Sequence, residues 1–269
     1  MAHVMEPSLV GACENIINFG ELWDSDKLFN NRAEIAAIYK EYSAMQAQAT
    51  RFISAAACFI SDTERLAASC MNSNKIAAFC ERFIRRELKN ISGNSKEETR
   101  LFSAVTPDGI TYFDNSIKEL ADRIFVIEDE WGAASATLMV RLKALLCDMG
   151  ANVIVGVSPF FPKTHIEQLI LPDLDTAIIL QTRLLVPKAI KPYRVYHARR
   201  FMDVDAMSEH RERLIFNRRA VRELIACASE TMECARNKHN SLESHYISAM
   251  DFTRMEEVIE RVNYEIFEK

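Results

Sequence analysis

The chain contains few residues of the kinds that break helices. Among its 269 residues only seven are glycine and seven are proline. These two residues dominate tight turns, because glycine accepts positive φ angles and proline fixes φ in advance. Their scarcity argues against a fold with many tight turns and predicts long helices.

Long apolar runs and a strong bias of charge are also lacking. No apolar stretch approaches the roughly 18–20 residues that a membrane-spanning helix needs, and the N-terminal stretch MAHVMEPSLVG does not have the basic-then-apolar pattern of a secretory signal. The net charge of −5 gives no general reason to expect nucleic acid. Local basic stretches contain interleaved acids, which is typical of solvated helix faces. We therefore expect a cytoplasmic protein without a membrane or a specific nucleic-acid partner.

Paired metal ligands are missing from the sequence. The seven cysteines form no C-x-x-C pair and fall mostly within helical patterns. We expect them to be buried, reduced thiols rather than disulfides or zinc ligands. His239 and His245 are six positions apart, whereas two ligands on one helix face lie three or four apart. The sequence predicts no metal site and marks no catalytic residue.

Apolar periodicity divides the chain into helical and mixed regions. Residues 26–90 have apolar side chains every three or four positions, with one interruption near SCMNSNK, and this pattern predicts helices. The polar stretch at 90–99 is typical of a linker. Beyond it RLFSAV is predicted to be a short strand and ITYFDNSIKELADR a helix. The runs RIFVIED, ANVIVGV and DTAIIL then alternate with helical or loop segments, as expected for a parallel sheet in an α/β layer. From Ala206 onward the pattern is helical again.

The two helical regions resemble each other. Displacing the chain by 179 positions aligns identical residues without a gap: Asp24 with Asp203, Asp26 with Asp205, Arg32 with Arg211, Glu64 with Glu243, and Glu81-Arg82 with Glu260-Arg261. This register predicts an internal repeat in which residues 26–88 and 205–267 form the same helical hairpin. The paired carboxylates before each first helix are interpreted as N-caps and partners of the helix dipole rather than as acid–base pairs.

The stretch DEWGAASAT at residues 129–137 lies in the context of a phosphate-binding loop. An apolar run precedes it and an amphipathic helical pattern follows it, which is the strand–turn–helix path of such loops. The candidate site residues are the positions of this degenerate loop: Asp129, Gly132, Ala134, Ser135, Ala136 and Thr137. The sequence predicts that the path is kept and the chemistry lost.

The lost chemistry is visible position by position. In the pattern G-x-x-x-x-G-K-[ST], Asp129 and Ala134 stand where the two glycines belong, and Ser135 stands where the lysine reaches the phosphates. Ala136 replaces the hydroxyl that holds Mg²⁺, and Thr137 comes one position late. Catalytic phosphoryl transfer is therefore not expected from this loop.

Charge opposes phosphate binding as well. Glu128, Asp129 and Glu130 would stand beside the phosphates. At ~6 Å and an effective dielectric near 20, each like-charge pair costs roughly 3 kcal/mol. A helix terminus offers only about 0.3–1 kcal/mol per charge in return. The run DTAIIL also ends without the carboxylate expected of a metal-holding second strand.

Several segments together suggest a family. They are AHVMEP at residues 2–7, IINFGELWDSDKL, RLFSAVTPDGITYFDNS, the degenerate loop and HIEQLILPDLDTAIIL. With these segments the chain resembles a bacterial family of tandem P-loop ATPases of unknown cellular role. In that family each repeat is an α/β nucleotide-binding core followed by a helical hairpin. The resemblance implies a first core before Met1 and a second P-loop that is intact in typical members, so this chain looks like a truncated or divergent member.

The predicted fold class is α/β. It consists of a P-loop NTPase-like parallel-sheet core and two flanking, mutually related α-helical hairpins in a helix-rich chain. Residues 1–95 form a partial first repeat, with a connecting segment and a hairpin. Residues 96–198 form the α/β core of the second repeat, and residues 199–269 form its hairpin.

Two functional hypotheses follow. The first is a non-catalytic pseudo-NTPase module that needs no cofactor and acts through a protein partner or self-association. The second is a nucleotide-binding ATPase, using ATP and Mg²⁺, whose active core lies in a missing N-terminal half or in a partner chain. Arg199 and Arg200 would then be arginine fingers toward that partner, or else surface salt-bridge residues. The apolar stripe of the first hairpin must find a surface on the second core or on another copy: Ile35, Tyr42, Phe52 and Phe59.

Overall fold

The fold is described from a computed structural model that places residues 16–89, 91, 93 and 95–267. The family-like segment at residues 2–7, Cys13 and Asn90 of the linker lie outside the described residues. Contacts group the chain into a core unit, Met45–Glu233, and a terminal unit made of Met1–Ala44 and Cys234–Lys269. The boundaries between the two units fall within two long helices. The sequence had instead predicted three domains that follow one another along the chain.

The core unit is built on a six-stranded sheet in the order β1-β5-β6-β7-β4-β8. Its strands are β1 Glu97–Arg100, β4 Arg123–Glu128, β5 Val153–Val157, β6 Ile166–Leu171, β7 Thr176–Gln181 and β8 Arg194–His197. Pairings β1–β5, β7–β4 and β4–β8 are parallel, but β6 is antiparallel to both of its neighbours. The sheet is therefore mixed, and the expected wholly parallel sheet was wrong at β6.

The direction of β6 follows from the length of its connection to β7. Only the 3-10 turn η2, Pro172–Leu174, and Asp175 in a left-handed conformation separate the two strands. A parallel pairing would need a crossover of a dozen or more residues, so a link this short forces an antiparallel hairpin. The strand itself escaped prediction because Glu167 and Gln168 interrupt its apolar run, although all six of its residues are buried.

A second, two-stranded sheet stands where a longer helix was expected. β2 Ser103–Thr106 and β3 Gly109–Tyr112 form an antiparallel hairpin, and α4 covers only Asp114–Lys118. The hairpin turns at Gly109, which has a φ of 92° that favours glycine. The helix predicted from Ile110 was wrong in its first residues, because the β-branched and aromatic run Ile110, Thr111 and Tyr112 pairs with β2 instead.

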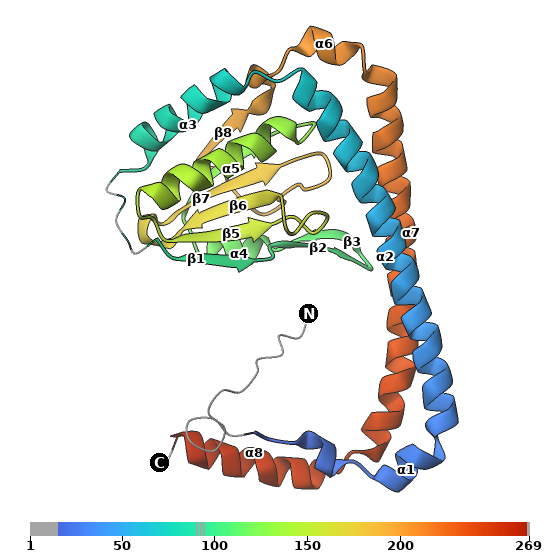
Figure 1. Cartoon of the computed structure of the whole chain (residues 1–269). Coiled ribbons are helices and arrows are strands. Elements are labelled where there is room, and N and C mark those ends of the chain that lie inside the picture. The colour runs from blue at the N-terminus through green and yellow to red at the C-terminus, as the bar shows by residue number, and fades with distance from the viewer. Residues whose placement is uncertain (1–15, 90, 92, 94, 268–269) are drawn as a thin grey trace. The chain divides into compact units, whose positions relative to one another are not determined.

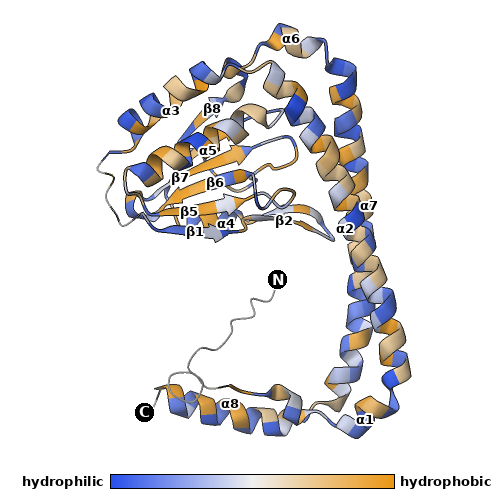
Figure 2. Ribbon diagram, in the orientation of Figure 1, coloured by the Kyte–Doolittle hydropathy of each residue, from blue (hydrophilic) through white to orange (hydrophobic). Residues whose placement is uncertain are grey.

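Two helices cover one face of the six-stranded sheet (Figure 1). α5, Ala133–Asp148, and α3, Ser73–Glu87, contribute their apolar faces to a single buried cluster with the sheet. Aromatic rings mark the contact of α3, where Phe83 lies 5.0 Å from the ring of Phe125 on β4. α4 contributes Ile117 to a second cluster built on Val126 and Ile179. The strands β6 and β7 are correspondingly hydrophobic in Figure 2.

The predicted internal repeat is confirmed in its helix boundaries. Helices α1 Ser25–Asn30, α2 Arg32–Ser69 and α3 begin 179 positions before α6 Val204–Ser208, α7 Arg211–Ala249 and α8 Phe252–Phe267. The 3-10 turns η1, Phe19–Leu22, and η3, Ala198–Phe201, have the same displacement. The lengths of α2 and α7 are 38 and 39 residues, and those of α3 and α8 are 15 and 16.

Hydrogen bonds repeat with the same displacement. In the terminal unit the Asp24 amide donates to the Ala249 carbonyl at 2.8 Å, and in the core unit the Asp203 amide donates to the Cys70 carbonyl at 2.7 Å. The Asp24 carboxylate accepts from the Lys27 amide, and the Asp203 carboxylate caps α6 in the same way. The interpretation of Asp24 and Asp203 as N-caps is therefore confirmed.

Burial of the cysteines differs from the expectation. All six described cysteines are free thiols, but only Cys70 and Cys80 are buried, whereas Cys58, Cys227 and Cys234 are exposed. The exposed three lie on the long helices α2 and α7, where falling within a helical pattern says nothing about which face a residue occupies. Burial raises the pKa of the Cys80 thiol to about 11.

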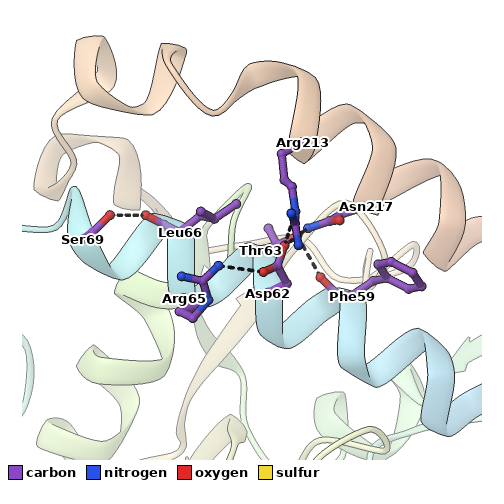
Figure 3. Close-up of polar contacts among 8 residues, drawn as sticks. All are labelled: Phe59, Asp62, Thr63, Arg65, Leu66, Ser69, Arg213 and Asn217. Carbon is purple, nitrogen blue, oxygen red and sulfur yellow. Dashed lines mark hydrogen bonds and ion pairs between the residues drawn. The ribbon is translucent and has the colours of Figure 1, made fainter.

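Within the core unit, α2 and α7 are joined by a polar network around Asp62 (Figure 3). The Asp62 carboxylate accepts hydrogen bonds from Asn217 Nδ2 at 2.8 Å, Arg65 at 2.9 Å and Arg213 Nε at 2.9 Å. One turn away, the Phe59 and Phe216 rings meet edge to face at 5.8 Å. Part of the apolar stripe of the first hairpin is thus covered by α7, a surface that the sequence had not suggested.

We expect Asp62→Asn to lower the free energy of unfolding by about 1 kcal/mol at neutral pH, because it removes a charged acceptor whose arginine partners are solvent-exposed. Hydrogen bonds from Asn217 and then Arg65 lower the pKa of Asp62 from 3.8 to about 2. The stabilisation is therefore present above pH 3.8 and lost as the pH falls through about 2. Urea unfolding of both proteins across this range measures it. Glu223→Gln, in the exposed Arg219 pair, is the control and should have little effect at any pH.

Candidate functional site

The degenerate loop connects β4 to α5 at the carboxyl end of the parallel strands. Gly132 is the N-cap of α5 and has a φ of 84°, a left-handed conformation that favours glycine. A Cβ atom at this position would also lie 2.9 Å from Glu64 Oε1 of α2. The positive φ angle is the reason that favours glycine here, and any larger residue would also have to displace the Glu64 side chain.

Asp129 occupies the centre of the loop. Its side chain is buried, with 1% of the residue exposed. One carboxylate oxygen accepts from the Trp131 amide at 3.1 Å and the other from the Ser135 amide at 2.8 Å. Its own amide donates to the Gln181 carbonyl at the end of β7. The protein therefore supplies its own anion to the amides at the beginning of α5, where the helix dipole favours negative charge.

The other predicted site residues divide between core and cavity. Ala134 and Ser135 are buried, and the Ser135 hydroxyl donates to the Gly132 carbonyl within the loop at 2.9 Å. Ala136 lines a cavity beside the loop, whereas Thr137 is exposed. The structure thus keeps these residues on one strand–loop–helix segment without turning a hydroxyl or a cation toward the amides.

The two acids that flank Asp129 have partners of their own. Glu128 lies 2.7 Å from His197 Nδ1 on β8, and Glu130 pairs with Arg183 after β7. Glu128 and Glu130 therefore each contact a side chain of another segment, and among the three acids Asp129 is the one bound to the loop amides. The expectation that all three carboxylates would face a phosphate applies to Asp129 alone.

A cavity of about 1390 Å³ lies beside the loop within the core unit. Its walls come from α2, the β2–β3 hairpin, β6, the segments after β4, β5 and β7, the short helix α6 and residues 211–225 of α7. Its lining includes Glu64, Tyr112, Gly132, His165, Glu167, Arg211, Arg218 and Arg222. The cavity is larger than the roughly 300–1,000 Å³ typical of small-molecule sites, so it has room for a small molecule.

Buried polar groups on β6 form part of this cavity wall, and the sequence reasoning missed them. Glu167 is only 2% exposed, and the Ser103 hydroxyl donates to its carboxylate at 2.8 Å. Burial raises the pKa of Glu167 above its usual range. His165 Nε2 lies 2.8 Å from Glu64 of α2. The available signal was the Glu167-Gln168 pair inside an otherwise apolar run, because a buried polar residue is more informative than a buried apolar one.

Arginines form a positive stripe along one side of the cavity. Arg211, Arg218 and Arg222 are spaced by seven and four positions on α7, so they lie on one face of the helix. None of the three has an ion-pair partner among the residues that the structure describes. The stripe gives the cavity a wall that is suited to a carboxylate or phosphate group.

Arg200, one of the two residues considered as arginine fingers, packs on aromatic rings. Its guanidinium lies 5.8 Å from the Phe79 ring and 5.7 Å from the Phe201 ring. Such an arrangement contributes cation–π attraction within the core unit.

Comparison with protein-family models, with curated proteins and with solved structures finds no match. Within the described ranges no helix is long and apolar enough to span a membrane. The same part of the chain holds no cluster of three or more histidine, cysteine or acidic side chains arranged to bind a metal.

Proposed function

We propose that this chain is a non-catalytic pseudo-NTPase module that works by binding a protein partner. The observation that carries the proposal is the buried Asp129 carboxylate, which accepts hydrogen bonds from the Trp131 and Ser135 amides. In a working phosphate-binding loop, such amides bind phosphate. Here they are satisfied from within, and neither a lysine nor a hydroxyl for Mg²⁺ is in register.

The ancestry of the loop belongs to the same proposal. A left-handed glycine, a helix that begins directly after it and parallel pairing of β4 with β7 and β8 are features of P-loop folds. Together with the segments that resemble tandem P-loop ATPases, these features support descent from a nucleotide-binding loop. The β6–β7 hairpin is a departure from a wholly parallel sheet.

Exposed apolar side chains in the terminal unit support a protein partner. Large hydrophobic residues are exposed there on η1, α1, α2, α7 and α8: Phe19, Phe29, Tyr39, Ile247, Phe252, Ile259, Tyr264 and Ile266. Scattered exposed apolar residues are ordinary, but many on a few helices are typical of an interaction surface.

Calorimetric titration with Mg-ATP tests the non-catalytic assignment. We expect no binding in the micromolar range by the unmodified chain, because the loop amides are already occupied. Ser135→Lys alone should restore little, since Asp129 and Glu130 would pair with the new cation. The joint change Asp129→Gly, Ala134→Gly, Ser135→Lys and Ala136→Ser removes the internal anion and should gain affinity. Micromolar binding by the unmodified chain that these loop changes abolish would overturn the assignment.

A second candidate function is the binding of an anionic small molecule in the cavity, which the arginine stripe favours. Mutations distinguish the two candidate functions, because the arginine stripe lies on α7 and the degenerate loop precedes α5. An anion whose binding is lost in Arg218→Ala but kept when Asp129 is replaced would belong to the cavity. An exposed arginine outside the cavity, Arg219, provides the matched control.

A further inference from the structure

Among the described residues of the terminal unit, the apolar face of α8 has little cover. Although α8 is strongly amphipathic, none of its residues is buried, and Ile259 is 43% exposed. Hydrophobic and hydrophilic residues alternate along its length (Figure 2). Among the described elements η1 packs on α8. A sixteen-residue amphipathic helix of this kind depends on packing of its apolar face.

The internal repeat shows what covers the equivalent face of α3. The α3 residues displaced by 179 positions from Met255, Val258, Ile259 and Val262 are Ile76, Phe79, Cys80 and Phe83. All four are buried in one cluster with the sheet and α5. Phe79 also meets Phe201 of η3 at 5.3 Å, so α3 packs on η3 as α8 packs on η1. The turn and helix are therefore common to both copies, but in the part of the chain that the structure describes only α3 packs on an α/β core.

The residues that precede η1 and η3 show the same difference between the two units. Directly before η3, β8 pairs in parallel with β4, and the Tyr196 ring lies 5.1 Å from Phe79. The positions equivalent to Val195, Tyr196 and His197 are Ile16, Ile17 and Asn18. These three precede η1 and belong to no strand, and both isoleucines are exposed. They have the backbone groups and apolar side chains of an edge strand, and no described strand pairs with them.

From this equivalence we infer that the terminal unit is a docking surface for the α/β core of a partner protein. Residues 16–18 add as a parallel edge strand to the partner's sheet, and the face of α8 formed by Met255, Val258, Ile259 and Val262 covers the helix and strands beside it. The inference rests on the proposed function and deepens it, because it names the kind of protein partner.

A second copy of this chain does not fit the surface. The edge of β4 on its own core is already paired with β8, and the face beside it is already covered by α3. The required partner must have a core whose equivalent edge and face are free. The partner's helix beside α8 is expected to carry a basic residue. In the core unit, Glu81 of α3 pairs with Arg141 of α5 at 3.3 Å. The residue of α8 that is equivalent to Glu81 is Glu260.

Site-specific photo-cross-linking of the full chain tests the inference. A benzophenone amino acid replaces Ile259 in cells of the source organism, and the cross-linked peptides are identified by mass spectrometry. Arg261 is the control position, because it lies about 160° around α8 from Ile259 and its equivalent, Arg82, is exposed. We expect a product from Ile259 and not from Arg261, joined to a strand or the following helix of a different protein with an α/β core.

A second variant makes the result quantitative. With the cross-linker at Val262, Ile259→Glu should reduce the product at least about tenfold, because it places an unpaired charge in the contact. Glu257→Gln, away from the apolar face, should leave the yield unchanged. Products that join two copies of this chain, products with a protein lacking an α/β core, or equal yields from Ile259 and Arg261 would overturn the inference. Each of these outcomes leaves the calorimetric test of the proposed function standing, so the two failures are distinguishable.

Discussion

Replacing Ile76 with alanine is expected to lower the free energy of unfolding by about 2–5 kcal/mol, whereas the equivalent change Met255→Ala costs less than about 1 kcal/mol. Both residues occupy the same position of the repeat, on α3 and α8. Ile76 is fully buried in the main cluster of the core unit, so its removal leaves a cavity. Met255 is only partly buried, so its removal exposes no core.

Urea unfolding followed by circular dichroism measures both effects in the full chain. Hydrogen exchange resolves them further, because amides of α3 should lose protection in Ile76→Ala while those of α8 are unchanged in Met255→Ala. Thr253→Ala, on the exposed side of α8, serves as a control for helix content. Equal losses from Ile76→Ala and Met255→Ala would show that α8 is packed as tightly as α3, and would contradict the contrast on which the docking surface depends.

The second large effect is expected at Asp129. Asp129→Ala should destabilise the protein by about 2–3 kcal/mol, because it leaves the Trp131 and Ser135 amides without their acceptor in a buried site. Asp129→Asn keeps an acceptor oxygen and the shape of the side chain, so its cost should be about half as large. Thermal unfolding in a buffer free of phosphate and sulfate gives both values.

An added anion distinguishes a structural cap from an ordinary buried residue. Once Asp129→Ala frees the amides, inorganic phosphate should raise the unfolding temperature of the variant more than that of the unmodified chain, since a ligand of the folded state stabilises it by mass action. Glu130→Ala, which breaks only an exposed pair with Arg183, should cost less than about 1 kcal/mol and show no phosphate effect. Equal phosphate shifts in the variant and the unmodified chain would mean that Asp129 is not a substitute anion.

At the candidate site, the sequence indicated the path of the loop but not its internal bonding. A strand, a small-residue turn and a helix were predicted from periodicity around Gly132, and the structure has all three. From its position in the sequence, Asp129 was predicted to repel a phosphate group bound at the loop. The structure places the same carboxylate on the loop amides, because a buried carboxylate must find hydrogen-bond donors and the nearest ones are at the beginning of α5.

The cavity is the part of the site that the sequence did not reveal. Arg211 and Arg222 lie far along the chain from Glu64 and Glu167, and no local pattern connects them. The sequence predicts a solvated helix face for the charges on α7, and these arginines are exposed, but it does not show that Arg211, Arg218 and Arg222 also line the cavity. Only the pairing of α7 with α2 decides which face of the helix is turned toward the sheet.

The sequence by itself determined the helices, their caps and the repeat. Apolar spacing, Asp24 and Asp203 at the helix starts and a gapless register of 179 positions are local or self-comparing signals, so they could be read without contacts. The tertiary structure alone decided the antiparallel direction of β6, the anion inside the loop and the different burial of α3 and α8. Each of those depends on what a residue meets across space. Helices α3 and α8 share an apolar pattern and nearly the same length, and their burial differs because an α/β core lies against α3.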